Sequence, residues 1–455
     1  MLLRFFSSFI LLACLTLALA GPASAVSPEA EALARRAVSE NTSESEQAIA
    51  RLRAMGPEGL RTLFEVYASE IERQLQDASD AASRQKDPAW QRLSAALDAV
   101  GQQRNAYTSR LYWYTDFAAA KAAAQKSGKP ILSLRLLGRL NEELSCANSR
   151  FFRTALYSNA QISTLLRERF ILHWKSVRPA PRVTVDFGDG RKFESTITGN
   201  SIHYILDPDG RVLDALPGLY GPQAFLRELS RMEALAKELQ GQTDEQQRAK
   251  ILRAFHDERI DALAKSWAND LEKTGVKLPR EIEAANPAEK RPPSARAAER
   301  MAMTKAITEN GIVNAITFDA RTLQSVTDEA AWAKIAALHA DDARLDQNSL
   351  SLMRRQNPNL REIAPQTTQL SSDEALFLRL KQNFERYIAL DTVRNEYWLH
   401  TKLHAWLLNA RFPNDLEALN ERVYAELFLT PRTDPWLGLY APDAYTALDH
   451  GGVSR

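Results

Sequence analysis

Residues 114–134 have the sequence Tyr-Thr-Asp-Phe-Ala-Ala-Ala-Lys-Ala-Ala-Ala-Gln-Lys-Ser-Gly-Lys-Pro-Ile-Leu-Ser-Leu. The alanine- and lysine-rich part, residues 117–127, predicts a helix, and Gly128 with Pro130 predicts its end. The apolar run 131–137 then predicts a strand. A helix that leads directly into a strand begins an α/β unit, so this stretch decides the fold class of the middle of the chain.

The elements that follow complete this unit. Residues 149–169 predict one or two helices, and residues 170–174 predict a second strand. Residues 183–194 alternate around a Gly-Asp-Gly turn, and residues 204–213 flank Asp-Pro-Asp-Gly, so each predicts a hairpin. Residues 222–239 predict a closing amphipathic helix. The expected fold is an α/β sandwich with a mixed sheet.

Both flanks of this segment are helical in composition. Apolar residues within 26–111 have helical spacing that is interrupted at Gly56-Pro57, which predicts a helical hairpin. Residues 241–455 predict a larger helical domain, because only two glycines lie between positions 242 and 430. Within it, the apolar-poor stretch 279–293 predicts a proline-rich linker or surface loop. The α/β domain itself is expected at residues 112–240.

Residues 1–25 have the pattern of a secretory signal. Arg4 supplies the positive start, residues 5–20 form a mostly apolar run, and Ala23-Ser-Ala25 is a small-residue cleavage site. The apolar run is short for a membrane span, and no later stretch is long and apolar enough to provide one. We therefore expect a secreted protein located in the periplasm, with no transmembrane segment after signal removal.

Charge and cysteine content exclude several classes of function. Lysine plus arginine number 58 and aspartate plus glutamate 57, and a formal net charge of +1 argues against a nucleic-acid partner. The two cysteines are Cys14, within the signal segment, and Cys146. The mature chain then has a single thiol, which rules out a disulfide framework and a four-cysteine zinc site. Neither a phosphate loop nor a dinucleotide fingerprint is present, so we expect no cofactor.

Residues 112–240 resemble the thioredoxin-like superfamily, and its secreted branch in particular. The resemblance is carried by residues 114–134, by Leu-Ser-Cys-Ala-Asn-Ser at 144–149, by the hairpin at 204–213 and by the helix start at 222–229. It covers little more than a quarter of the chain. The resemblance implies a thioredoxin-like sandwich in which the strand-to-helix turn carries the reactive thiol.

Two departures from the family pattern change what the resemblance implies. The family's active site is Cys-x-x-Cys, whereas here Ser149 stands at the place of the second cysteine after Cys146. The family also has a cis-proline just before the last hairpin, whereas residues 199–203 are Gly-Asn-Ser-Ile-His. Ser201 in this stretch is the residue expected opposite the thiol. The implied site is therefore a degenerate, monothiol one.

We expect Cys146 at the N-terminus of a helix, where the helix dipole favours the thiolate, with support from Arg150 and Arg153. A thiolate there could attack the disulfide of a partner protein and form a mixed disulfide. Ser149 cannot resolve that intermediate, so turnover would need an external thiol. If the chain is an enzyme, it would be a monothiol thiol-disulfide oxidoreductase. The alternative is a buried, inert cysteine in a non-catalytic thioredoxin-fold platform that binds a protein partner through its helical arms.

A second alternative function lies in the C-terminal region. Glu396, His400 and His404 are spaced by four residues, which places three potential metal ligands along one side of a helix. Aromatic and aliphatic residues surround them, so the histidines are equally typical of a packing helix. Both readings stay open on the sequence.

Overall fold

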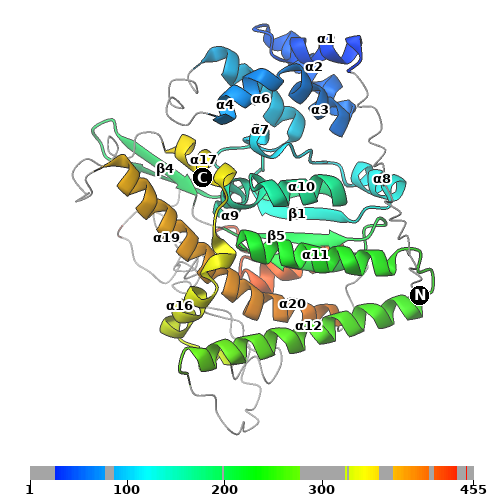
Figure 1. Ribbon diagram of the computed structural model, residues 1–455, viewed down its shortest axis with the longest axis vertical. Coiled ribbons are helices and arrows are strands. Elements are labelled where there is room, and N and C mark those ends of the chain that lie inside the picture. The colour runs from blue at the N-terminus through cyan, green and yellow to red at the C-terminus, as the bar shows by residue number, and fades with distance from the viewer. Residues whose placement is uncertain are drawn as a thin grey trace, which may run out of the picture.

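The computed structural model describes residues 26–76, 87–196, 199–276, 323–324, 327–357, 372–408, 415–437 and 447. The predicted signal segment and the predicted proline-rich stretch, residues 1–25 and 279–293, lie outside these described residues. Figure 1 shows N-terminal helices at one end of the molecule, a sheet next to them, and long C-terminal helices on the other side of the sheet.

The N-terminal helices form a small bundle with a hydrophobic core of its own, which includes Leu52, Leu63 and Leu97. Gly56, at φ 69°, and Pro57 separate two of these helices as expected. The predicted hairpin is nevertheless too small, because two helices bury too little apolar surface and further helices complete the core. The bundle consists of α1 (Pro28–Ala37), α2 (Thr42–Ala54), α3 (Pro57–Val66), α4 (Ala68–Gln76), α6 (Pro88–Gly101) and α7 (Ala106–Ser109).

The central sheet has four strands in the order β2-β1-β5-β6. They are β1 (Ile131–Leu137), β2 (Ile171–Arg178), β5 (Ser201–Leu206) and β6 (Val212–Pro217). Strand β1 pairs in parallel with β2 and antiparallel with β5, and β5 pairs antiparallel with β6. The predicted mixed sheet is therefore confirmed. Every residue of β1, β5 and β6 is buried, so both faces of this part of the sheet are covered.

Two different sets of helices cover the two faces. Helices α10 (Ala160–Arg169) and α11 (Pro222–Leu239) contact each other and lie on one face (Figure 1), where His203 bonds Tyr157. Helix α8 (Phe117–Ser127) packs on β1 and β2. On the face opposite α11, Arg135 pairs with Glu417 of α21 (Leu416–Arg422). The C-terminal region thus supplies part of the cover of the sheet.

A second, two-stranded sheet projects from the molecule (Figure 1). It is the hairpin of β3 (Arg182–Asp186) and β4 (Lys192–Thr196), whose register pairs Val185 with Phe193. The Gly-Asp-Gly turn predicted for it is present, because Gly188 and Gly190 both have positive φ. Most of its residues are exposed, in contrast to the central sheet.

The C-terminal helices share one hydrophobic core with the central sheet, and this core extends from Leu111 to Phe428. The domain boundary expected at residue 240 therefore falls within a continuous core. The C-terminal elements, besides α21, are α12 (Glu245–Lys273), α16 (Glu329–Leu338), η2 (Ala340–Ala343), α17 (Gln347–Gln356), α19 (Asp373–Arg394), η3 (Asn395–His400), α20 (Thr401–Leu408) and η4 (Val423–Leu427). Within the described ranges, each helix is either too short or too polar to cross a membrane.

A polar cluster joins three of the C-terminal elements. His339 lies between two carboxylates, with its Nε2 2.6 Å from Asp270 Oδ2 and its Nδ1 3.6 Å from Asp342 Oδ2. The Tyr397 hydroxyl also donates to Asp270 Oδ2, at 2.6 Å. The carboxylates of Asp342 and Asp270 raise the pKa of His339 above its usual value, against the opposing effect of burial. The folded state therefore favours the protonated imidazole.

We expect a His339→Gln variant to lose stability in a pH-dependent way. A raised pKa in the folded state stabilises the protein fully below the unfolded value of about 6.5, and this contribution disappears as the pH rises through the folded value. The loss should be about 1–2 kcal/mol near pH 5.5 and smaller near pH 8.5. Urea unfolding at the two pH values measures it, with Lys334→Gln on the exposed face of α16 as control. An equal loss at both pH values would show that protonation of His339 between Asp270 and Asp342 does not stabilise the fold.

Candidate functional site

The structure brings three of the predicted thiol-site residues together at the carboxyl end of β1. Cys146 is the N-cap of α9 (Ala147–Phe151), and its backbone N–H bonds the Leu137 carbonyl at 3.2 Å. Its Sγ lies 3.3 Å from Ser149 Oγ and 3.0 Å from Ser201 Oγ. The cysteine thus occupies the helix N-terminus expected from the sequence, with the two serines as its polar neighbours.

The thiol has no access to solvent, because Cys146 is 0 % exposed and belongs to the main hydrophobic core. The end of β4 is bonded to the residue before the thiol. Thr196 Oγ1 donates to the Ser145 carbonyl at 3.3 Å and accepts from the Arg150 guanidinium at 2.9 Å. A cysteine reacts with a partner disulfide only if the partner reaches its sulfur, so the packing around Cys146 must open before any exchange.

Two arginines, Arg150 and Arg153, were expected to favour the thiolate. In the structure they donate hydrogen bonds to backbone and hydroxyl oxygens. Arg153 is buried and donates to the carbonyls of Leu140 and Glu143, at 3.0 and 3.2 Å, so it holds the loop between β1 and α9. Burial lowers the pKa of Arg153 to about 10, which still leaves it charged at neutral pH. Arg150 is engaged with Thr196. Both side chains stabilise the closed site around Cys146.

A second polar cluster lies between the sheet and the C-terminal helices. Asp214 of β6, His400 at the end of η3 and His404 of α20 are all 0 % exposed. Asp214 Oδ1 lies 3.2 Å from His400 Nε2 and 3.6 Å from His404 Nδ1. On the other side, Nδ1 of His256 from α12 lies 2.9 Å from His404 Nδ1. We call these four residues the His/Asp cluster. Burial lowers the pKa of His404 and of His256.

The predicted metal set of Glu396, His400 and His404 is therefore only partly assembled. Glu396 lies 3.9 Å from Arg227, outside the group of possible ligands. Burial, with the nearby Glu228, raises the pKa of Glu396 to about 7. In the tertiary structure Glu396 lies near Arg227 and Glu228 of α11, so helical spacing alone did not decide the ligand set.

Sequence reasoning missed Asp214 and His256. One local signal pointed to Asp214, since it interrupts the apolar run Val-Leu-Asp-Ala-Leu of residues 212–216. A charged residue in a strand buried on both faces must have a buried partner. His256 had no such signal, because α12 is a polar helix in which a histidine is unremarkable.

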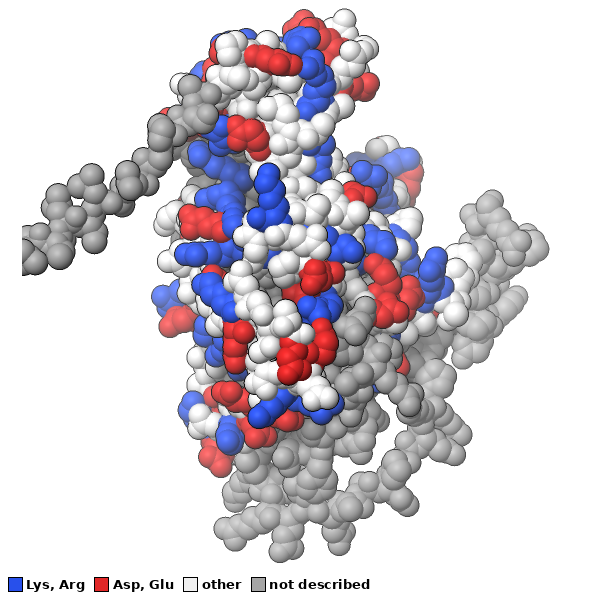
Figure 2. Space-filling model, turned by 90° about the vertical axis from the view of Figure 1, so that its right-hand side faces the viewer, with Lys and Arg blue, Asp and Glu red and all other residues white. Residues whose placement is uncertain are grey.

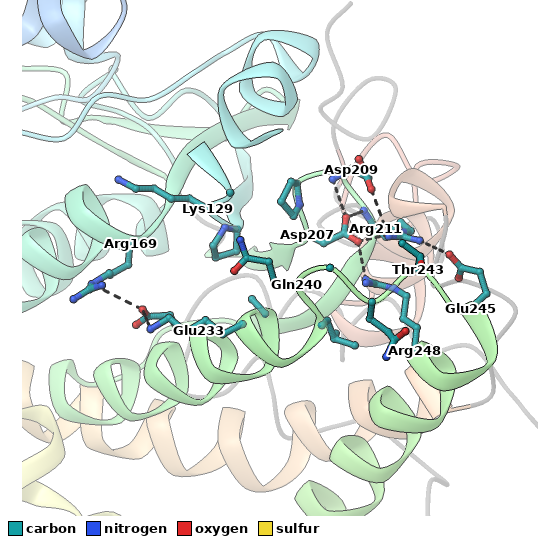
Figure 3. A pocket seen from close by; sticks show the side chains of 18 of the residues that line it. Lys129, Arg169, Asp207, Asp209, Arg211, Glu233, Gln240, Thr243, Glu245 and Arg248 are labelled. Atoms are coloured by element: carbon teal, nitrogen blue, oxygen red, sulfur yellow. Dashed lines mark hydrogen bonds and ion pairs between the residues drawn. The ribbon is translucent and has the colours of Figure 1, made fainter. Parts of the chain in front are cut away.

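A charged cavity of about 560 Å³ lies at the opposite end of the sheet from Cys146. Figure 3 shows Arg211 and Arg248 directed at Asp207, and each approaches Asp207 Oδ2 to 2.7 Å. Arg169 faces Glu233 at 3.9 Å. These wall charges pair with one another, so the cavity offers no excess charge of one sign to a ligand. On the face shown in Figure 2, basic and acidic side chains are likewise interspersed.

Comparisons with known proteins add no relative. No protein-family model matches the chain, and neither a search of curated proteins nor one of solved structures finds a match.

We expect Cys146 to be protected from alkylation in the folded protein. Two variants are compared, both with Cys14→Ser. The first keeps Cys146, and the second has Cys146→Ser and carries a surface cysteine on α6 through Ala95→Cys. A maleimide should label Cys146 in the first at least about 100-fold more slowly than the surface cysteine in the second. Mass spectrometry measures both rates, and denaturant should make them equal. Similar rates in the folded state would show that the cover opens freely and would favour thiol exchange.

Proposed function

We propose that this chain is an exported, thioredoxin-like protein that binds a protein partner and does not exchange thiols. Support for the fold assignment comes from the mixed sheet and from Cys146 at the turn between β1 and a helix, where the resemblance expects the attacking thiol. The observation that carries the function is the complete burial of Cys146 in the main hydrophobic core. Fold alone does not determine activity, and a covered thiol without a second cysteine is unsuited to exchange.

The β3–β4 hairpin is the surface that we assign to partner binding. It leaves the protein body at Thr196, next to the covered thiol, and carries three exposed apolar side chains, Val185, Phe187 and Phe193. Phe187 and Phe193 are each 58 % exposed. Large apolar side chains are rarely left in water together unless they bind something, so this cluster favours contact with another protein.

The charges of the hairpin indicate what kind of partner would fit. Lys192 pairs with Asp186 at 3.0 Å, and Arg191 pairs with Asp189 at 2.7 Å. Because these charges already neutralise each other, they add little net attraction for a charged partner. The partner surface that complements the hairpin is therefore an apolar one, reached by aromatic side chains from the hairpin.

A site-specific cross-linking experiment tests this function. A photoreactive phenylalanine analogue at Phe193 should give a discrete adduct in the cells that produce the protein. The matched control carries the analogue at Tyr387, an aromatic residue of α19 that is 51 % exposed. Adding Phe187→Ser should reduce the Phe193 adduct several-fold, because it removes half of the aromatic surface.

The cross-linking results can be interpreted only if the substituted proteins are folded. All three positions are exposed, so circular dichroism and the thermal midpoint should stay as in the unsubstituted chain. Equal adducts at both positions, or none at Phe193, would refute partner binding by the hairpin. Thiol exchange is then the remaining proposal, and the alkylation rate of Cys146 decides it.

A further inference from the structure

We propose that Asp214, His400 and His404 of the His/Asp cluster form a metal site that takes Zn²⁺. These side chains come from β6, η3 and α20, so the tertiary fold assembles them from two distant parts of the chain. Asp214, His400 and His404 each offer one ligand atom, and these three atoms all lie within 4.8 Å of one another. This site is independent of the partner-binding function proposed above, and the two can fail separately.

The distances between the inward-facing atoms fit one tetrahedral ion. Bonds of about 2.1 Å in tetrahedral geometry place neighbouring ligand atoms roughly 3.4 Å apart. Asp214 Oδ1 lies 3.2 Å from His400 Nε2 and 3.6 Å from His404 Nδ1. His256 Nδ1 is 2.9 Å from His404 Nδ1 but lies outside the group of three ligand atoms, so His256 is a neighbour of the site and not a fourth ligand. Small movements of Asp214, His400 and His404 would let these three side chains bind one ion.

The chemistry of the three groups indicates the kind of metal. Two imidazoles and one carboxylate are nitrogen and oxygen ligands that Zn²⁺ prefers, whereas Ca²⁺ and Mg²⁺ prefer oxygen alone. Asp214, His400 and His404 are 0 % exposed. Three protein ligands leave the fourth tetrahedral position to a water molecule or another small ligand.

The charge of Asp214 also favours a cation at this place. Asp214 Oδ1 accepts a hydrogen bond from the Ala215 N–H at 2.8 Å and lies 3.2 Å from His400 Nε2. A buried carboxylate requires positive charge nearby, and a divalent cation bound by Asp214, His400 and His404 would supply it.

A bound metal would link the sheet to the C-terminal helices and stabilise their packing. Strand β6 contacts both η3 and α20. A ligand that binds the folded state alone stabilises it by mass action, and here it would bind only when these three elements are in place. The ion should therefore be acquired during folding, because the folded cluster has no opening to solvent.

The experiment uses the purified full chain, unfolded in denaturant with a chelator and then refolded with or without equimolar Zn²⁺. We expect about one bound zinc per chain by mass spectrometry after gel filtration, and a thermal midpoint raised by about 5 °C or more. Co²⁺ in place of Zn²⁺ should give the visible absorption of a tetrahedral site. A folded chain that binds no zinc and has an unchanged midpoint overturns the proposal.

Substitutions then locate the site. His404→Gln and Asp214→Asn should each weaken zinc binding at least about tenfold, whereas the matched controls Glu396→Gln and His339→Gln should leave it unchanged. The helical spacing predicted Glu396 as a ligand, so unchanged zinc binding in Glu396→Gln would show that Glu396 is not part of the ligand set. If His404→Gln fails to fold, His400→Gln and the wild-type stoichiometry still decide the question. Zinc retained at full affinity by all three cluster variants would overturn the assignment.

Discussion

Strand β1 is buried along its entire length and is paired on both edges, with β2 in parallel and with β5 antiparallel. Neither its faces nor its edges reach water, so the rest of the protein must cover it. Helices α10 and α11 cover one face, and α8 with α21 covers the other. This requirement explains why one hydrophobic core extends from Leu111 to Phe428. The C-terminal region therefore supplies part of the cover of the sheet.

Polar groups inside this covered sheet determine how the C-terminal helices dock. Arg135 in β1 is buried and bonds Ser133 at 2.7 Å and Glu417 of α21 at 2.9 Å. Asp214 in β6 has His400 of η3 as a partner. An isolated buried charge costs several kcal/mol, so each of these positions requires a partner from a C-terminal element. Apolar burial brings the helices to the sheet, and these pairs select the orientation in which they settle.

The same covering explains the state of the thiol. Cys146 has the local position that favours a reactive cysteine, because it precedes a helix at the end of a central strand. Its chemistry depends on access, however, and Cys146 is 0 % exposed within the main hydrophobic core. The hairpin that ends beside this site at Thr196 also carries the exposed Phe187 and Phe193.

The sequence by itself determined the elements of the α/β segment. The bounds of the helix at 117–127, the strand at 131–137 and the helix at 222–239 agree with the structure, because glycine, proline and apolar periodicity act over a few residues. Helical spacing also singled out His400 and His404. Only the tertiary structure decided that Asp214 and His256 join them, that Glu396 does not, and that Cys146 is sealed. These outcomes depend on strand order and on contacts between residues far apart in the chain, which no local pattern encodes.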